Sequence, residues 1–254
     1  CNAAQTFQRF MDSIFHDMEG IFVYMDDILV ATPDEASHRH LLRRLFHRLR
    51  EHGLAVNPAK CQFGRDTLQF LGHEVSSRGI SPLPDRVKAV REFPTPRDKQ
   101  ALMEFLGLLN YYHRFLPRAA HLLYPLNAAL RKDAGPFTWT EDMQSAFTSA
   151  KNALADTTML VHPKADAPLC IASDASDKAV GASLEQFVDG SWEPLGFFSA
   201  TLHAAETRYS TFDRELLAIY LAIKHFRHMV EGRQLTVYTD HKPLTHAMTS
   251  AADY

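Results

Sequence analysis

Two adjacent aspartates, Asp26 and Asp27, stand in the middle of an apolar stretch near the start of the chain. The hydrophobic residues on each side predict two short strands that are buried on both faces, with the acids in the turn between them. Two ionised carboxylates against a buried sheet are costly unless a cation neutralises them. Because Mg²⁺ binds one or two carboxylates together with phosphate oxygens, the pair indicates phosphate chemistry. Asp-Asp taken alone is more commonly a solvated hairpin turn.

Three further acids, Asp174, Glu215 and Asp240, lie in the last third of the chain. The patterns there predict a strand over 169–174, a hairpin, a long helix and a strand over 235–239. A crossover of this kind returns the last strand parallel to the first, so that Asp174 and Asp240 would lie at matching carboxyl ends. Glu215, one turn into the crossover helix, would lie over those ends.

Each of these three acids alone is more simply explained as a loop start, a helix cap or a solvated helix face. Three carboxylates that converge repel one another unless divalent cations bridge them, and such sites hydrolyse phosphodiesters. We therefore predict a metal site at Asp174, Glu215 and Asp240. The neighbouring acids Asp177, Glu206 and Asp213 lack this convergence and are expected to be structural.

The composition limits the kinds of protein that this chain can be. The 254 residues are 46% hydrophobic, enough for one large or two modest cores. The three cysteines have no paired spacing, which argues against a disulfide framework or a zinc module and fits a reducing compartment. No apolar run approaches the length of a membrane span and no signal peptide is visible, so we expect an intracellular protein without a membrane partner.

The first half of the chain predicts an acidic hairpin between two helices. Residues 5–18 carry hydrophobic residues at helical spacing, and Thr32 is expected to cap a helix that runs to Gly53. The second helix carries a cluster of arginines, at positions 39, 43, 44, 48 and 50. Such a face can bind a phosphate backbone, although a solvated face is the more common explanation.

The middle of the chain predicts strands and then helices. Strands are expected over 54–56, 61–63 and 68–75, and Gly72 in the last of them marks a bulge or the close approach of another backbone. Helices are expected over the following ranges: 85–93, 98–112, 124–132 and 141–155.

The last third predicts a hairpin, 180–187 with 192–199, that turns at Asp189-Gly190. The crossover helix is expected to begin near Ser210 and to end at Gly232, and Pro243 is expected to open a further helix. The residues predicted to face the core from the crossover helix are Leu216, Tyr220, Ile223 and Phe226.

Short motifs along almost the whole chain resemble the Pol polyprotein of gypsy-type LTR retrotransposons and their retroviral relatives. In order they are AQTFQR at 4–9, YMDD at 24–27, NPAKC at 57–61, FLGH at 70–73, FLGLLNYY at 105–112, WTE at 139–141, the stretch 211–220 and TDHKPL at 239–244. Their number and order make a chance match untenable.

This resemblance implies an α/β protein in three parts. Residues 1–80 would be the C-terminal part of an α+β reverse transcriptase palm, and 81–137 a helical thumb and connection. Residues 138–254 would be a ribonuclease H-like mixed sheet with a crossover helix, truncated at its C-terminus. Two acids of the family have no counterpart: a palm aspartate expected before residue 1 and a fourth ribonuclease H acid expected after residue 254. The chain is therefore expected to be a fragment with part of each active site.

The resemblance also assigns roles to residues. Asp26 and Asp27 would hold Mg²⁺ in the palm, with Met25 near the primer end. A primer grip would consist of four consecutive residues: Phe70, Leu71, Gly72 and His73. The helix over 98–112 would be a thumb helix that follows the template–primer. The three acids of the ribonuclease H site would be Asp174, Glu215 and Asp240, and each active site would use two Mg²⁺ ions, with Mn²⁺ as a substitute.

The implied function is an RNA-directed DNA polymerase with ribonuclease H activity, working by two-metal phosphoryl transfer. Its partners would be dNTPs, a template–primer and an RNA–DNA hybrid recognised by A-form shape and 2′-hydroxyls. A dimer through the rest of the polyprotein, in a cytoplasmic virus-like particle or the nucleus, is a further expectation. The competing hypothesis is a decayed or co-opted module that binds nucleic acid without catalysis. An integrase-like nuclease is a weaker one, because the palm hairpin speaks against it.

Overall fold

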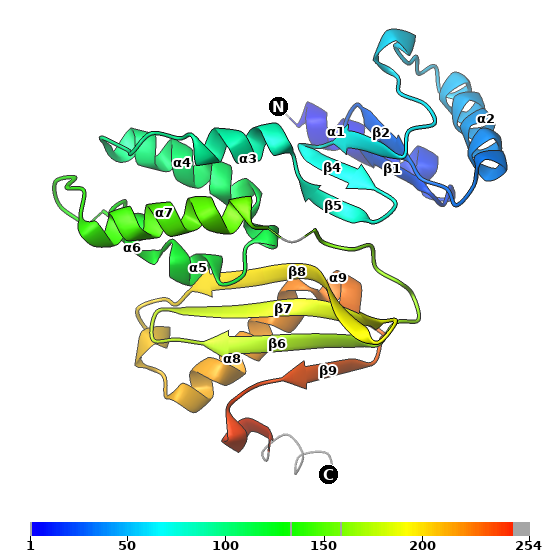
Figure 1. The fold of residues 1–254 in the computed structure, drawn as a ribbon. Helices are drawn as coiled ribbons and strands as arrows, with labels where there is room; N and C mark the ends of the chain where they lie inside the picture. The colour runs from blue at the N-terminus through cyan, green and yellow to red at the C-terminus, as the bar shows by residue number, and fades with distance from the viewer. Residues whose placement is uncertain (1, 133, 158, 246–254) are drawn as a thin grey trace. The chain divides into compact units, whose positions relative to one another are not determined.

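The computed structural model describes residues 2–132, 134–157 and 159–245 (Figure 1). Its contacts divide the chain into two compact units, residues 1–71 and 72–254. Both units contain helices and strands, which confirms the predicted α/β class. Among the described residues, no helix combines the length and the apolar composition that crossing a bilayer requires.

The first unit consists of two helices and an antiparallel hairpin. Its elements are α1 (Ala3–Phe15), β1 (Ile21–Tyr24), β2 (Asp27–Val30) and α2 (Glu35–Glu51). Both predicted helices are present. They enclose a core that includes Met11, Ile14 and Leu45, against which the alternate strand residues Ile21 and Val23 pack.

The prediction that these strands are buried on both faces is wrong. Phe22 and Tyr24 are 55% and 56% exposed, because successive side chains of a strand point to opposite faces and only one face of β1 meets the core. Within the described residues this sheet has two strands. An apolar run therefore does not by itself establish burial on both sides.

The start of α2 also differs from the prediction. The N-cap is Asp34, not Thr32, and its carboxylate accepts a 2.8 Å hydrogen bond from the Ser37 amide. Asp34 has the extended backbone that an N-cap needs, so the helix begins at Glu35.

The strands predicted over 54–56 and 61–63 are absent from the described residues. A 3₁₀ turn, η1 (Pro58–Lys60), lies between these segments, capped by the Asn57 side chain, which accepts from the Ala59 amide. The strand predicted over 68–75 is divided into β3 (Thr67–Phe70) and β4 (His73–Ser76). Leu71 and Gly72 separate them, both with positive φ. Two consecutive positive φ angles make a turn of the I′ kind, not a bulge.

The second unit begins with a hairpin and a helical region. Its elements are β4, β5 (Gly79–Pro82), α3 (Pro84–Arg91), α4 (Lys99–Tyr111), η2 (His113–Phe115), α5 (Ala119–Leu122), α6 (Tyr124–Ala128) and α7 (Glu141–Ala155). Phe105 of α4 and Phe147 of α7 pack with ring centroids 4.5 Å apart. The helix predicted over 124–132 is shorter than expected and ends at Ala128.

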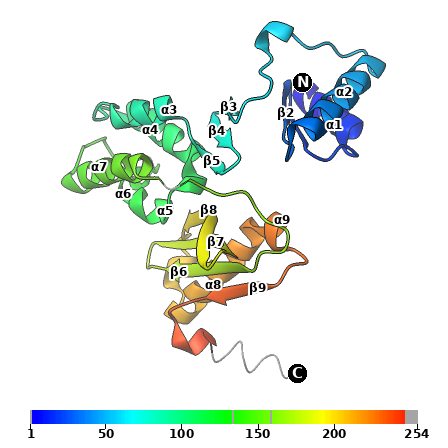
Figure 2. The ribbon, with the colours of Figure 1, turned by 45° about the vertical axis from the view of Figure 1, so that its right-hand side comes forward.

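A four-stranded sheet in the order β8-β7-β6-β9 completes this unit (Figure 2). Its strands are β6 (Leu169–Ala175), β7 (Ala179–Val188), β8 (Ser191–Thr201) and β9 (Leu235–Tyr238). Strand β6 runs antiparallel to β7 and parallel to β9. The crossover passes through η3 (Glu206–Arg208), α8 (Thr211–His225) and α9 (Arg227–Val230). Both the predicted hairpin and the predicted parallel return are confirmed.

The predicted core face of α8 is mostly wrong. Phe226, just after the helix, is buried as expected, but Tyr220 is 58% exposed and Leu216 and Ile223 are also exposed. The residues that α8 buries are Glu215, Ala218, Ile219 and Ala222. Two apolar stripes lie one residue apart on this helix, and the one rich in alanine allows the helix to approach the sheet closely.

The end of the crossover also differs, because α8 ends at His225 and the short helix α9 follows before Gly232. Residues 242–245 are helical, in agreement with the start predicted at Pro243. The continuation of that helix past residue 245 lies outside the described residues.

Candidate active site

Asp26 and Asp27 lie at the tip of the β1–β2 hairpin, and both side chains are exposed. Because both carboxylates are exposed, the predicted cost of burying them does not arise, and it cannot be the reason for a cation to bind here. Met25 precedes them with a φ of 55°. The tip is fixed by Gln8 of α1, whose Oε1 accepts from the Met25 amide at 2.6 Å and whose Nε2 donates to the Val23 carbonyl at 3.1 Å.

Gln8 is a positioning residue that the sequence reasoning did not single out. It lies within the AQTFQR motif at 4–9, which was the available signal. Its two hydrogen bonds hold the backbone on the amino side of the acid pair, so the carboxylates project from a fixed turn instead of a loose loop.

The arginines of α2 are partly used within the first unit. Arg48 donates to both carboxylate oxygens of Asp17 at 3.0 Å, and this pair lowers the pKa of Asp17. Arg39 pairs with Glu35 at 2.6 Å, while Arg43, Arg44 and Arg50 are exposed. The arginine cluster thus divides into residues that hold the unit together and residues that face solvent.

Gly72 and His73 meet the end of α4. The Tyr112 hydroxyl donates to the Gly72 carbonyl at 2.8 Å, and the His73 ring stacks on Tyr111 with centroids 5.3 Å apart. A Cβ atom added to Gly72 would lie 2.6 Å from the Tyr111 hydroxyl. Within the second unit, the close approach at this glycine is therefore made by a tyrosine side chain.

Replacing Gly72 with alanine is expected to lower the free energy of unfolding by about 1–3 kcal/mol, because alanine is strained at a φ of +69° and its methyl group displaces Tyr111. The matched control is Gly232→Ala, since that glycine has a φ of +75° and nothing within 4 Å of an added Cβ. Urea unfolding should show a larger loss for Gly72→Ala than for the control. Equal losses would show that the Tyr111 contact contributes nothing.

The acids of the last third lie near the carboxyl end of strand β6. Strands β6 and β9 pair in parallel from Leu169 opposite Leu235 to Ala172 opposite Tyr238, and Asp174 and Asp240 each lie two residues beyond the last pair. Glu215 is 4% exposed on α8, and its Oε1 accepts from the Ala175 amide at 3.2 Å. Its Oε2 is buried without a hydrogen-bond partner among the described residues.

Both other acids affect the pKa of Glu215. Burial is the largest cause that raises the pKa of Glu215, and the charges of Asp240 and Asp174 raise it further, against the lowering effect of the Ala175 amide and His241. A buried carboxylate oxygen with no partner, in a side chain whose pKa two further carboxylates raise, has the chemistry that a cation would satisfy.

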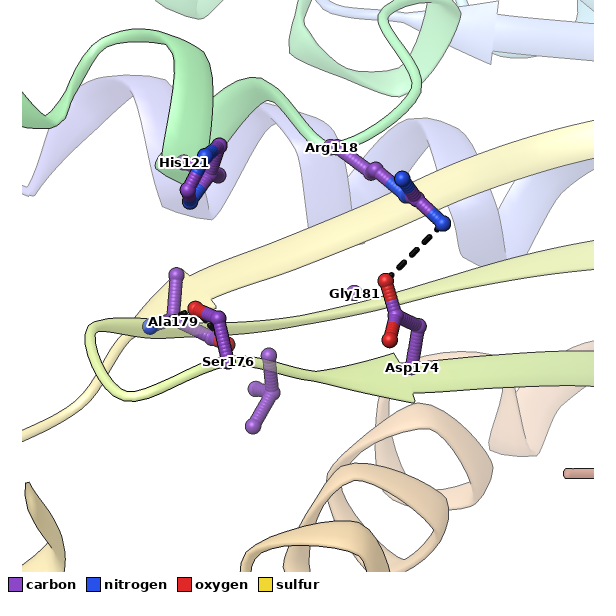
Figure 3. A pocket seen from close by; sticks show the side chains of 7 residues that line it. Arg118, His121, Asp174, Ser176, Ala179 and Gly181 are labelled. Carbon is purple, nitrogen blue, oxygen red and sulfur yellow. Dashed lines mark hydrogen bonds and ion pairs between the residues drawn. The ribbon is translucent and has the colours of Figure 1, made fainter. Parts of the chain in front are cut away.

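The acids do not form a closed ligand set. Within residues 2–132, 134–157 and 159–245, no group of three or more His, Cys, Asp or Glu side chains is arranged to hold a metal ion. Asp174 Oδ2 instead lies 2.9 Å from Arg118 Nη2 (Figure 3). Arg118 is the second residue that sequence reasoning missed, and no motif pointed to it.

Two of the neighbouring acids have local structural partners, as expected. Glu206 accepts from the His203 amide at 2.7 Å. At the start of α8 the Ser210 hydroxyl donates to Asp213 Oδ2 at 2.7 Å and accepts from the Asp213 amide at 3.1 Å. Asp177 is exposed in the turn between β6 and β7.

The raised pKa of Glu215 predicts a pH-dependent stability. Between the ordinary glutamate pKa and the raised one, the folded protein holds more protons than the unfolded chain, so stability is full at low pH and is lost as pH rises through the raised pKa. In EDTA at neutral pH, Glu215→Gln should raise the melting temperature by about 2–4 °C, the shift that about 1 kcal/mol produces at this chain length.

The control for this variant is Glu92→Gln, a change of the same kind at an exposed position after α3. Thermal melts followed by circular dichroism from pH 5 to pH 8 should separate the wild type from Glu215→Gln only at the higher pH values. A constant separation across that range would mean that charge on Glu215 is not the cause.

Two family models match the chain. Residues 1–75 match "Reverse transcriptase (RNA-dependent DNA polymerase)" and residues 139–237 match "RNase H-like domain found in reverse transcriptase". The chain therefore contains parts of a reverse transcriptase and of a ribonuclease H-like domain, as the resemblance predicted. Both matched families are parts of enzymes, and members of both generally use divalent metals.

Curated relatives of this chain are transposon polyproteins, in agreement with the resemblance to retrotransposon Pol. "Retrovirus-related Pol polyprotein from transposon 412" of Drosophila melanogaster is 36% identical over 249 residues, which is 96% of this chain and 20% of the relative. "Transposon Tf2-3 polyprotein" of Schizosaccharomyces pombe is 32% identical over 252 residues, 97% of this chain and 19% of the relative. The chain spans about one fifth of the length of these relatives.

Solved structures share the fold of this chain. The foamy viral protease-reverse transcriptase in complex with dsDNA matches with a TM-score of 0.82 and 22% identity, over 98% of this chain and 52% of that chain. The same protein in complex with an RNA/DNA hybrid matches with a TM-score of 0.81 and 21% identity, over 98% and 34%. At this level of identity the likeness concerns the fold alone.

Proposed function

We propose that this chain is part of an RNA-directed DNA polymerase with ribonuclease H activity. In this proposal residues 1–80 belong to the palm, 81–137 form the thumb and connection, and 138–254 belong to the ribonuclease H domain. The proposal is supported by the two family matches and by transposon relatives that align along almost the whole chain.

The nuclease half is supported by the buried Oε2 of Glu215, which has no hydrogen-bond partner among the described residues. It is also supported by the raised pKa of Glu215, to which burial contributes most and the charges of Asp240 and Asp174 contribute further. In the proposed site these three carboxylates hold divalent cations, Mg²⁺ or in its place Mn²⁺. When bound, the cations would activate a water and stabilise the leaving oxygen of a phosphodiester. The chain itself would contribute a fixed frame: the Ala175 amide donates to Glu215, and the parallel pairing of β6 with β9 would bring the two aspartates to the same end of the sheet.

In the polymerase half, Asp26 and Asp27 are proposed as cation ligands, with Met25 near the primer end. Their exposure at a turn that Gln8 fixes leaves both carboxylates accessible to a bound nucleotide and its cation. Phe70, Leu71, Gly72 and His73 are proposed as the primer grip. The α4 helix is proposed as a thumb helix that follows the template–primer.

The proposed partners are a template–primer, dNTPs and an RNA–DNA hybrid. The structures of the foamy viral protease-reverse transcriptase, which share this fold, support these partners, because they contain dsDNA or an RNA/DNA hybrid. A hybrid would be recognised by its A-form shape and its 2′-hydroxyls. A dimer formed through the rest of the polyprotein, and a place in a virus-like particle or the nucleus, belong to the same proposal.

The direct test uses the full-length protein with a duplex labelled on its RNA strand. We expect cleavage of the RNA in a hybrid when Mg²⁺ is present, no cleavage in EDTA, and no cleavage of a DNA duplex of the same sequence. Retained binding of the hybrid with no cleavage under any divalent cation would contradict the proposal and favour a nucleic-acid-binding module without catalysis.

A further inference from the structure

A small cavity lies beside Asp174 in the second unit. Its volume is about 170 Å³, and its walls include Arg118, His121, Asp174 and Ser176. Figure 3 shows the Arg118 side chain extending from the connection toward Asp174, while His121 stands apart from both. The Arg118 guanidinium and the Asp174 carboxylate are 2.9 Å apart, and both are partly exposed, 71% and 44%.

The backbone around Arg118 directs its side chain toward Asp174. Arg118 has left-handed φ and ψ angles of 52° and 30° and immediately precedes α5. That helix is tied to the sheet where the Ala120 amide donates to the buried Ser199 hydroxyl at 2.8 Å. The stem of Arg118 passes over Gly181 of β7, where an added Cβ would lie 3.7 Å from Arg118 Cγ.

The ion pair engages the Asp174 carboxylate, which is a ligand of the proposed divalent cation. One oxygen of Asp174 is engaged by a guanidinium, and a fixed positive charge lies next to the place where a divalent cation would bind. We propose that Arg118 sets the affinity of the Asp174 site for its divalent cation, because the cation binds Asp174 fully only after the guanidinium has left. Arg118 is thus a positioning residue. This inference rests on the proposed function, in which Asp174 is a cation ligand.

The test is a calorimetric titration of MgCl₂ into the full 254-residue chain without nucleic acid. Arg118→Asn removes the charge and suits a left-handed backbone, and Arg118→Gly removes the charge without any backbone penalty. Both should bind Mg²⁺ about two- to fivefold more tightly than the wild type, the range expected for a partly exposed ion pair. Arg118→Lys keeps the charge and should stay close to the wild type.

Two further variants separate the possible failures. Lys178→Asn is the matched control, because Lys178 lies near the same end of the sheet with its Nζ over the Tyr124 ring, 5.2 Å from the centroid. It should leave Mg²⁺ affinity unchanged, and Asp174→Asn should weaken it.

If Asp174→Asn weakens binding while both neutral Arg118 variants bind no more tightly than the wild type, the role of Arg118 is overturned and the proposed function stands. Equal tightening by Lys178→Asn would also overturn it, since a general charge effect would then suffice. If Mg²⁺ binds equally well to the wild type and to Asp174→Asn, the cation assignment falls, and the role of Arg118 falls with it.

Discussion

Replacing Asp174 with asparagine is expected to reduce Mg²⁺-dependent cleavage of the RNA strand of a hybrid by at least about 100-fold. Asparagine keeps the size of the side chain but removes the charge that would hold the cation. Asp174 lies near the carboxyl end of β6, which pairs in parallel with β9, and its charge contributes to the raised pKa of the buried Glu215. Initial rates on a labelled hybrid, with the full-length protein, measure the effect.

The matched control is Asp177→Asn, the same change at an exposed acid in the neighbouring turn. It should keep its activity within about twofold of the wild type, as is usual for a surface change away from special features. The ion pair between Asp174 and Arg118 is partly exposed, so its loss should cost at most about 1 kcal/mol of stability. Undiminished cleavage by Asp174→Asn, or an equal loss in the control, would remove Asp174 from the site.

Replacing Asp26 with asparagine is expected to reduce incorporation of dNTPs on an RNA template by at least about 100-fold. Asp26 lies exposed at the hairpin tip, and the main chain before it is held by Gln8. The change removes one charge from the proposed cation site. It should not disturb the core of the first unit, because other side chains of the hairpin pack against that core. Primer extension by the full-length protein measures the effect.

Asp66→Asn serves as the control for Asp26→Asn, because Asp66 is an exposed acid of the same unit outside the hairpin. It should extend primers at close to the wild-type rate. Asp26→Asn should at the same time retain hybrid cleavage, since the proposed nuclease acids lie in the other unit. Loss of both activities together would mean that the variant unfolds or that Asp26 acts on the whole protein.

The positions of the proposed nuclease aspartates at neighbouring strand ends could be predicted, because the parallel return of β9 determines them. A strand, a helix and a second strand in that order return parallel, which is what brings Asp174 and Asp240 to the same edge. The burial of Glu215 was harder, because α8 carries two apolar stripes. The larger side chains, such as Tyr220, drew the prediction to the wrong one, whereas the sheet accepts the small alanines beside Glu215.

Other features of the site depend on tertiary contacts that leave little local signal. The pairing of Arg118 with Asp174 depends on a left-handed turn at a residue type that rarely adopts one. Gly72 was recognised as special, but its neighbour is the Tyr111 side chain, brought there by a helix distant in sequence. The one-sided β1–β2 hairpin shows the same limit, because an apolar run reports hydrophobicity and not which face is covered.

The central claim is that Asp174, Glu215 and Asp240 together hold a divalent cation. The most direct measurement is anomalous diffraction from crystals of the full-length protein grown with Mn²⁺. We predict an anomalous peak bonded to oxygens of these three carboxylates at about 2.0–2.2 Å, with the Arg118 guanidinium moved away from Asp174. A Mn²⁺ peak that avoids all three carboxylates, or an Asp174 side chain still paired with Arg118 while the ion binds elsewhere, would contradict it.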